Sequence, residues 1–160
     1  MKKTTRLITQ AAIIAAIYVV LTEISSLMGL SSGVIQVRFS EALTVLPIFT
    51  SAAIPGLFIG CVISNILAGG IVWDVLFGSI ATLIGAVGTY FLGRKSKYLA
   101  PIPPILANSA IIPYVLKFAY GFEGALSFFV LTVFIGELIS CGLFGLMIIP
   151  TLERHKDIFK

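Results

Sequence analysis

The sequence predicts an all-α polytopic membrane protein, a single domain over residues 1–160 with six transmembrane helices. Of its 160 residues, 58% are hydrophobic and only 11% are charged, and the mean hydropathy is +1.08. This composition excludes an ordinary soluble domain. Apolar runs of nearly membrane-spanning length recur along the chain, and the alternating segments of about ten residues that mark a β-barrel are not seen.

The first three helices are delimited by charges, prolines and glycines. The chain starts with a basic stretch, and no small-residue cleavage site precedes Glu23, so we expect a retained first helix rather than a signal peptide. Residues 23–36 are polar and rich in Gly and Ser, which predicts a long loop and a candidate lid. Pro47 predicts a kink or an end in the second helix, and Pro55 suits the first turn of the third.

The remaining helices follow from similar signals. Trp73 and Asp74 introduce the fourth helix, where they fit an interfacial anchor and an N-terminal charge. Basic residues 94–97 separate it from the fifth helix, and residues 121–124 turn the chain into the sixth. The predicted helices span residues 7–22, 37–50, 55–69, 74–93, 104–120 and 125–149.

Basic residues alternate between the two sides of this predicted bundle. Lysines and arginines cluster before the first helix, after the fourth and after the sixth, whereas the loops on the opposite side are nearly free of them. The positive-inside rule therefore predicts that both termini are cytoplasmic.

Most polar residues inside the apolar segments lie near the predicted outer face, and a few lie deeper in the bundle. An intramembrane charge costs about 2.5 kcal/mol or more, so each is a functional-site hypothesis. Together they predict a pocket for a small, polar, flat molecule, with two aromatic residues as stacking surface. The alternative is structural: Arg38 pairs with Glu41 one turn away, or Lys117 pairs with Glu41 or Glu137. The candidate residues are Arg38, Glu41, Asn65, Asp74, Asn108, Lys117 and Glu137, with Trp73 and Tyr114 as the aromatic pair.

Several classes of function lack their sequence motifs. There is no GxxxxGK[ST] loop, so we expect no ATP hydrolysis by this chain, and no HExxH or GxSxG, so we do not expect an enzyme. Cys61 and Cys141 lie inside apolar segments without metal-ligand spacing, which predicts reduced packing residues and no metal or cofactor.

Four alanines in the first apolar run form two overlapping small-xxx-small patterns, which permit close helix approach. These residues are Ala11, Ala12, Ala15 and Ala16. By pattern alone they indicate packing inside the bundle.

The alanine-rich first helix, the six helices in 160 residues, and the segments VRFSEALTVLPIFTSAAIPGLFIGCVISNIL and DVLFGSIATLIGA resemble the QueT family. These are substrate-binding S components of energy-coupling factor (ECF) transporters for queuosine precursors. The resemblance implies an S-component-like bundle in a bacterial plasma membrane. It also implies a transmembrane coupling subunit, two cytoplasmic ATPases, and contact with that subunit through the alanines.

A deazaguanine ligand agrees with the polar residues. Glu137 is the first choice to accept its ring N–H and amino donors, and Asn65 or Asn108 suits its carbonyl edge. Glu41 or Asp74 would pair with an aminomethyl group. Two alternatives stay open: an S component for another vitamin or nucleobase, and a self-sufficient proton-coupled carrier that uses Glu41 and Glu137.

Overall fold

The computed structural model describes residues 3–31 and 35–159. Within these ranges the chain is all-α, as predicted, and contains no strand. The α-helices are α1 (Lys3–Leu27), α2 (Ala53–Leu67), α3 (Val72–Leu92), α4 (Ile102–Tyr114), α5 (Leu126–Glu137) and α6 (Gly145–Arg154). Segments of 3-10 or π-helix accompany them: η1 (Phe39–Ile48), η2 (Lys97–Leu99), η3 (Val115–Ala119), η4 (Leu138–Phe144) and η5 (Lys156–Phe159).

Four helical stretches of the described chain are long and apolar enough to cross a membrane. They are Lys3–Leu27, Val72–Leu92, Lys97–Ala119 and Leu126–Arg154. Two further apolar helices, η1 and α2, are shorter. The 15 residues of α2 reach about 22 Å at 1.5 Å per residue, less than the ~30 Å of a bilayer core. The fold is that of a helical membrane protein whose two short helices depend on their neighbours.

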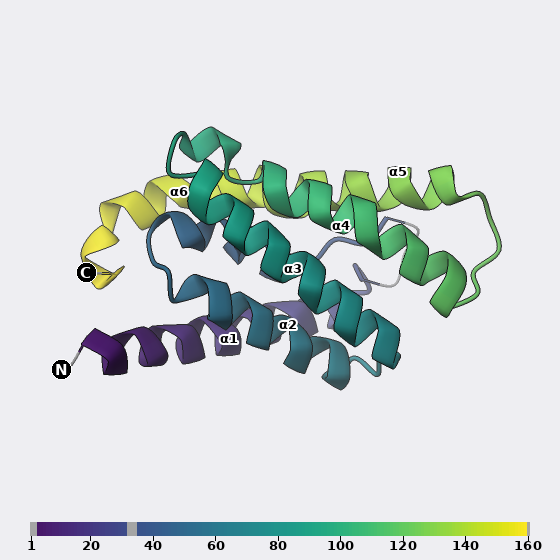
Figure 1. The fold of residues 1–160 in the computed structure, drawn as a ribbon, viewed down its shortest axis with the longest axis horizontal. Coiled ribbons are helices and arrows are strands. Elements are labelled where there is room, and N and C mark those ends of the chain that lie inside the picture. Colours follow the sequence, from purple (N-terminus) through teal and green to yellow (C-terminus); the bar gives the residue numbers. More distant parts are fainter. Residues whose placement is uncertain (1–2, 32–34, 160) are drawn as a thin grey trace.

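Successive helices run back and forth along one axis, so that both ends of the chain lie at the same end of the bundle (Figure 1). The Gln10 side-chain amide donates to the carbonyl of Ile158 at 3.2 Å, and the rings of Phe49 and Phe159 stack at 5.6 Å. These contacts join α1, η1 and η5 at this end, which we call the terminal end.

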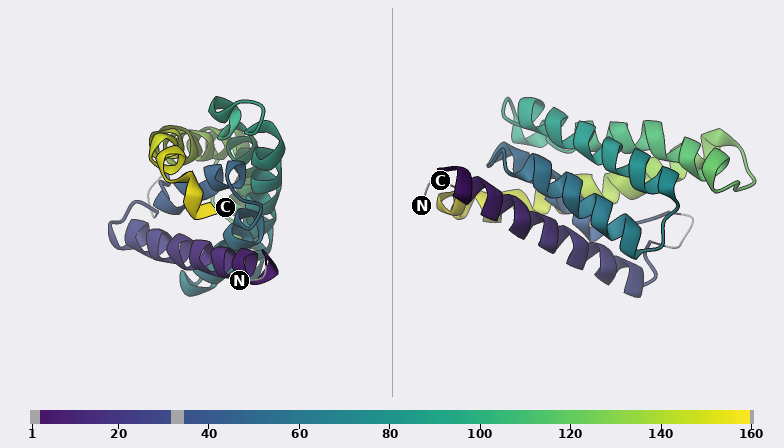
Figure 2. Two further views of the ribbon diagram at one scale, coloured as in Figure 1. Left: turned by 90° about the vertical axis from the view of Figure 1, so that its left-hand side faces the viewer. Right: turned by 60° about the horizontal axis from the view of Figure 1, so that its bottom comes forward.

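The second predicted helix, residues 37–50, differs from expectation. It is the 3-10 helix η1, which begins only at Phe39 and includes Pro47. An end-on view shows it enclosed by the other helices (Figure 2), and most of its side chains are buried. Runs of 3-10 helix this long are uncommon in isolation because their hydrogen bonds are poorer. Burial on all sides is the physical reason that this segment keeps a tighter, shorter form.

Helix α1 is longer than predicted and takes in the first part of the predicted loop, residues 23–27. Near this end of the helix, Thr22 and Ser25 form hydrogen bonds within α1 and with η1 or the residues beside it. Ser25 Oγ donates to the Leu21 carbonyl at 2.9 Å and accepts from the Phe39 amide at 2.8 Å. Thr22 Oγ1 lies 2.8 Å from Ser40 Oγ. Residues 32–34 of the predicted lid lie outside the described residues.

Candidate functional site

Two carboxylates meet at the centre of the bundle, one buried and one half-buried. Glu41 comes from η1 and is 3% exposed, and its Oε1 accepts a hydrogen bond from the hydroxyl of Tyr18 on α1. Glu137 stands at the end of α5. The thiol of Cys141, one turn later, lies 3.1 Å from Glu137 Oε2 and 3.8 Å from Glu41 Oε2. A single thiol therefore bridges the two acids. We call Tyr18, Glu41, Glu137 and Cys141 the carboxylate cluster.

The predicted structural ion pairs do not form in the described chain. Among residues 3–31 and 35–159, no lysine or arginine nitrogen lies within 4.0 Å of either carboxylate. Lys97 and Glu153 form an ion pair, 3.0 Å apart, away from these acids. The interpretation that Arg38 pairs with Glu41, or Lys117 with Glu41 or Glu137, is therefore wrong, because neutral donors bind the acids instead.

Arg38 is directed to an asparagine. Its Nη1 donates to Asn65 Oδ1 at 3.4 Å, and its backbone amide donates to Ser140 Oγ at 3.1 Å. Asn65 Nδ2 in turn lies 3.5 Å from the sulfur of Cys61. The residue before η1 is thus held by α2 on one side and by η4 on the other.

A small cavity of about 40 Å³ lies between these groups. Three of the predicted site residues, Arg38, Asn108 and Glu137, line its wall together with Gln36. The backbone before η1 closes it tightly, because a Cβ built on Gly136 would lie only 2.1 Å from the Gln36 carbonyl oxygen. The cavity has room for little more than one water molecule.

Asp74 lies close to this site but outside the cavity wall. Its Oδ2 accepts from the Tyr120 hydroxyl at 3.0 Å, which connects the start of α3 to the loop before α5. Burial, together with this carboxylate, raises the pKa of Tyr120. A Cβ on Gly78 would lie 3.1 Å from Asn65 Nδ2 and 3.8 Å from Asp74 Oδ1, so a bare glycine separates the two polar groups.

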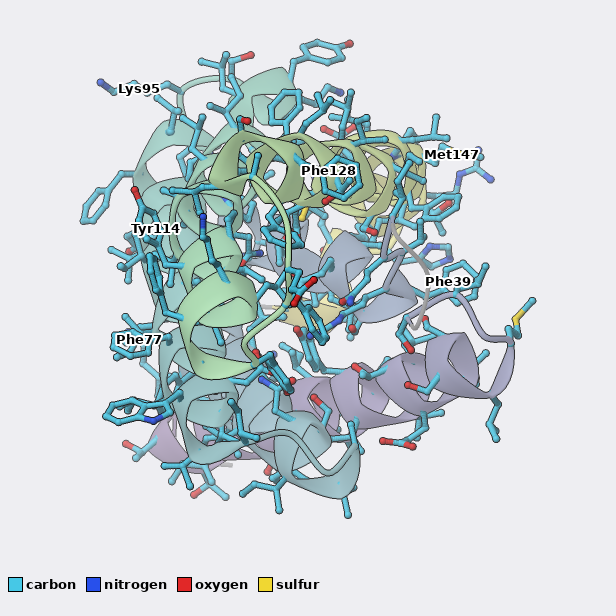
Figure 3. The ribbon with its side chains drawn as sticks, turned by 90° about the vertical axis from the view of Figure 1, so that its right-hand side faces the viewer. Phe39, Phe77, Lys95, Tyr114, Phe128 and Met147 are labelled. Carbon is cyan, nitrogen blue, oxygen red and sulfur yellow. The ribbon has the colours of Figure 1, made fainter. Side chains whose placement is uncertain are left out.

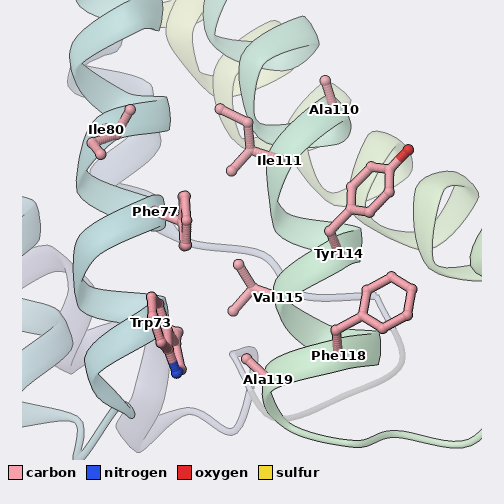
Figure 4. A pocket seen from close by; sticks show the side chains of 9 residues that line it. All are labelled: Trp73, Phe77, Ile80, Ala110, Ile111, Tyr114, Val115, Phe118 and Ala119. Carbon is pink, nitrogen blue, oxygen red and sulfur yellow. The ribbon is translucent and has the colours of Figure 1, made fainter.

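The structure separates Trp73, Tyr114 and Lys117 from the cavity. Trp73 and Tyr114 line a different groove, of about 540 Å³, between α3 and the α4–η3 helix (Figure 4). They are 55% and 52% exposed, and Lys117 Nζ lies 6.0 Å from the Phe118 ring centroid. Phe77 and Tyr114 lie at one side of the molecule and Phe39 at the opposite side (Figure 3). Asn108 and Tyr114 point apart because six helical residues turn the direction by about 240°.

The four alanines divide between two environments. Ala15 is 6% exposed, and a Cβ on Gly60 of α2 would lie 3.1 Å from its Cα. Likewise, a Cβ on Gly56 would lie 2.8 Å from the carbonyl oxygen of Ala11. Ala12 and Ala16 are exposed. A surface groove of about 450 Å³ runs along this junction of α1 and α2, lined by Leu7, Ile8, Ala11, Ala12, Ala15, Ser51, Ala52, Pro55 and Ile59.

Sequence reasoning missed Tyr18 and treated Cys141 as a packing residue. Spacing offered a signal for both. Tyr18 follows Ala15 by three residues on the buried face of α1, and Cys141 follows Glu137 by one turn. The sulfur of Cys141 and the carboxylate oxygens of Glu41 and Glu137 lie within 4.8 Å of one another, a spacing at which a cation would also have ligands. Hydrogen bonds from Tyr18 and Cys141 account for the close approach of these side chains.

Comparison with known proteins gives the family. A family model described as "QueT transporter" matches residues 8–154. A segment of 74 residues is 43% identical to "Queuosine precursor transporter QueT" of Lactococcus lactis subsp. cremoris (strain MG1363), and covers 46% of this chain and 43% of that protein. No solved structure matches the chain. The family is one of transporters, not enzymes. Because the family model extends over nearly all of α1 to α6, the chain belongs to the QueT transporter family.

Proposed function

We propose that the chain binds a queuosine precursor and is the substrate-binding S component of an ECF importer. The observation that carries this proposal is that Glu137 and Asn108 line one small cavity inside a chain of this family. The name of the Lactococcus relative supports the choice of ligand.

The chemistry of the cavity wall suits a deazaguanine. A carboxylate accepts two neighbouring donors, which matches the ring N–H and amino group of the guanine edge, and such charge-assisted bonds are strong in a dry site. We assign this role to Glu137. Asn108, beside it, offers a donor to the ligand carbonyl and an acceptor to a ring N–H. Arg38 keeps a positive charge near both acids without occupying them.

Ligand entry requires the backbone before η1 to move. A cavity of about 40 Å³ is far below the ~300 Å³ or more that small-molecule sites occupy. Gln36 and Arg38 belong to the wall and also to the segment that precedes η1. Displacing this segment from Gly136 would open the site, so we assign it the role of the lid.

Coupling to the ATPase module is assigned to the outward side of α1. Ala12 and Ala16 are exposed, and the groove at the junction of α1 and α2 is lined in part by small residues that let another helix approach closely. Both termini are assigned to the cytoplasm, where the ATPases lie.

The experiment that tests ligand and mechanism combines mass spectrometry with uptake. Purified protein should carry a deazaguanine of identifiable mass, and titration with aminomethyl-deazaguanine should saturate at one ligand per chain. Uptake into vesicles should require the coupling subunit and both ATPases with ATP. A co-purifying compound of another class would move the assignment to a different vitamin or nucleobase.

A proton-coupled carrier is the second candidate function. The observation in its favour is that Glu41 and the half-buried Glu137 are joined through one thiol, an arrangement that also suits proton exchange. Uptake by the chain alone, driven by a pH gradient and without ATP, would establish this candidate and exclude the S-component role.

A further inference from the structure

Cys141 occupies an unusual position for a cysteine in an apolar helix. It is 0% exposed, and its sulfur lies within hydrogen-bonding range of an oxygen from each of the two acids, Glu41 and Glu137. Thr44 Oγ1 approaches the same sulfur at 3.4 Å. The thiol is free rather than part of a disulfide. Its surroundings are therefore polar on two sides, and packing alone does not account for them.

A thiol has one hydrogen, so it donates to one carboxylate at a time. The shorter contact, 3.1 Å, is to Glu137, and the longer contact, 3.8 Å, is to Glu41. In the structure the hydrogen is thus directed to Glu137. Glu41 already accepts the Tyr18 hydroxyl, so it is not left without a donor.

The two acids differ in what they face. Glu137 is part of the cavity wall, whereas neither Glu41 nor Cys141 is. Donors from a ligand would reach Glu137 and would compensate its charge. Glu41 would then be the less compensated of the two acids, and the thiol hydrogen would turn to it although the contact is longer.

We infer that Cys141 is a positioning residue whose thiol hydrogen bond moves from Glu137 to Glu41 when a ligand engages Glu137. The inference rests on the proposed function, because it requires a ligand with hydrogen-bond donors at Glu137. In the unliganded protein the thiol holds the Glu137 carboxylate in the orientation that receives the ligand. In the complex the thiol donates to Glu41, the acid that does not line the cavity.

Infrared difference spectroscopy of the S–H stretching band tests the movement directly. Wild-type protein is measured with and without aminomethyl-deazaguanine, and Cys141→Ser identifies the Cys141 band by its loss. The band should shift to higher frequency on binding, because the hydrogen bond changes from a contact of 3.1 Å to one of 3.8 Å. A band that stays in place, or that shifts to lower frequency, would overturn the inference.

Affinity measurements provide the second test. Cys141→Ser keeps a hydrogen for the carboxylates and should bind aminomethyl-deazaguanine within about threefold of wild type. Cys141→Ala should bind about tenfold more weakly, because the Glu137 carboxylate is no longer held in the orientation that receives the ligand. Thr89→Val is the matched control, because it removes another buried hydroxyl bond, 2.8 Å to the Ala100 carbonyl, toward the terminal end of α3. It should lower thermal stability but leave affinity unchanged.

The outcomes separate this inference from the proposed function. If wild-type protein binds no deazaguanine, the proposed function fails. If it binds, and Cys141→Ala binds as tightly as Cys141→Ser, the positioning role is wrong while the function stands. If Cys141→Ala does not fold, the infrared measurement on wild type and Cys141→Ser still decides the inference.

Discussion

At the residue scale, the site consists of charges that are compensated by neutral donors. Isolated burial of a carboxylate is strongly unfavourable, and removing one partner of a buried charge leaves a large desolvation penalty. Here a tyrosine hydroxyl and a thiol supply the hydrogens for Glu41 and Glu137. The sequence shows which residues carry charge, but it does not show which neutral side chains fold against them. For that reason the acids were predicted and Tyr18 was not.

Tyr18→Phe tests the donor role of Tyr18. The ring is 1% exposed and packs in the core, so phenylalanine keeps the packing and removes only the hydroxyl that donates to Glu41. The free energy of unfolding should fall by about 1–3 kcal/mol, the scale of an unsatisfied buried acceptor. Denaturant unfolding in detergent micelles measures it. Tyr90→Phe, with no hydroxyl bond in the described structure, is the control and should change little. Equal losses in both variants would contradict the assignment.

Glu137→Gln tests recognition of the guanine edge. Glutamine keeps the shape but turns one oxygen into a donor that faces a ligand donor. Binding of aminomethyl-deazaguanine should weaken by about 2 kcal/mol or more, the scale of a buried charged hydrogen bond left unmet. Isothermal titration with this ligand, and with a competitor that lacks the amino-pyrimidinone edge, measures the difference. Glu123→Gln makes the same change on the exposed loop before α5 and should bind normally. Normal binding by Glu137→Gln would remove Glu137 from the site.

At the element scale, the sequence predicts the order and direction of the apolar segments better than their internal form. Hydrophobic runs and Gly/Pro punctuation placed α2, α3 and the long final helix to within a few residues. The 3-10 form of η1 and the π-helical turns η3 and η4 depend on packing, which hydropathy does not record. Hydropathy also does not show in which direction a side chain points around its helix axis. That is why Trp73 and Tyr114 line an outer groove rather than the cavity.

The junction of α1 and α2 separates packing alanines from exposed ones. Ala15→Leu would force a large side chain against Gly60, and overpacking of this kind costs about 1–3 kcal/mol. We expect lower thermal stability and weaker ligand binding. Ala16→Leu is the matched variant on the exposed side of the same turn. It should keep stability and binding but lose co-purification with the coupling subunit. If Ala16→Leu assembles and transports normally, the coupling surface lies elsewhere.

At the scale of the whole molecule, the bundle has two different ends. The terminal end joins η5 to α1 and η1, and carries the ion pair between Lys97 and Glu153. At the opposite end, Tyr120 beside the loop before α5 bonds to Asp74, and the segment before η1 lines the cavity. The basic loop between α3 and α4 belongs to the terminal end. Positive charge and both termini at one end are what the positive-inside rule expects of the cytoplasmic side.

Cysteine labelling in intact cells tests this orientation. The native cysteines give a low background, because Cys61 and Cys141 are only 2% and 0% exposed. Lys95→Cys places a thiol on the exposed loop after α3, and Glu123→Cys places one on the exposed loop at the opposite end. A membrane-impermeant maleimide added outside should label Glu123→Cys at once and Lys95→Cys only after the cells are opened, since the bilayer blocks the charged reagent. The unsubstituted chain should stay unlabelled in both conditions. The reverse pattern would place the cavity on the cytoplasmic side and would require the substrate path to be inverted.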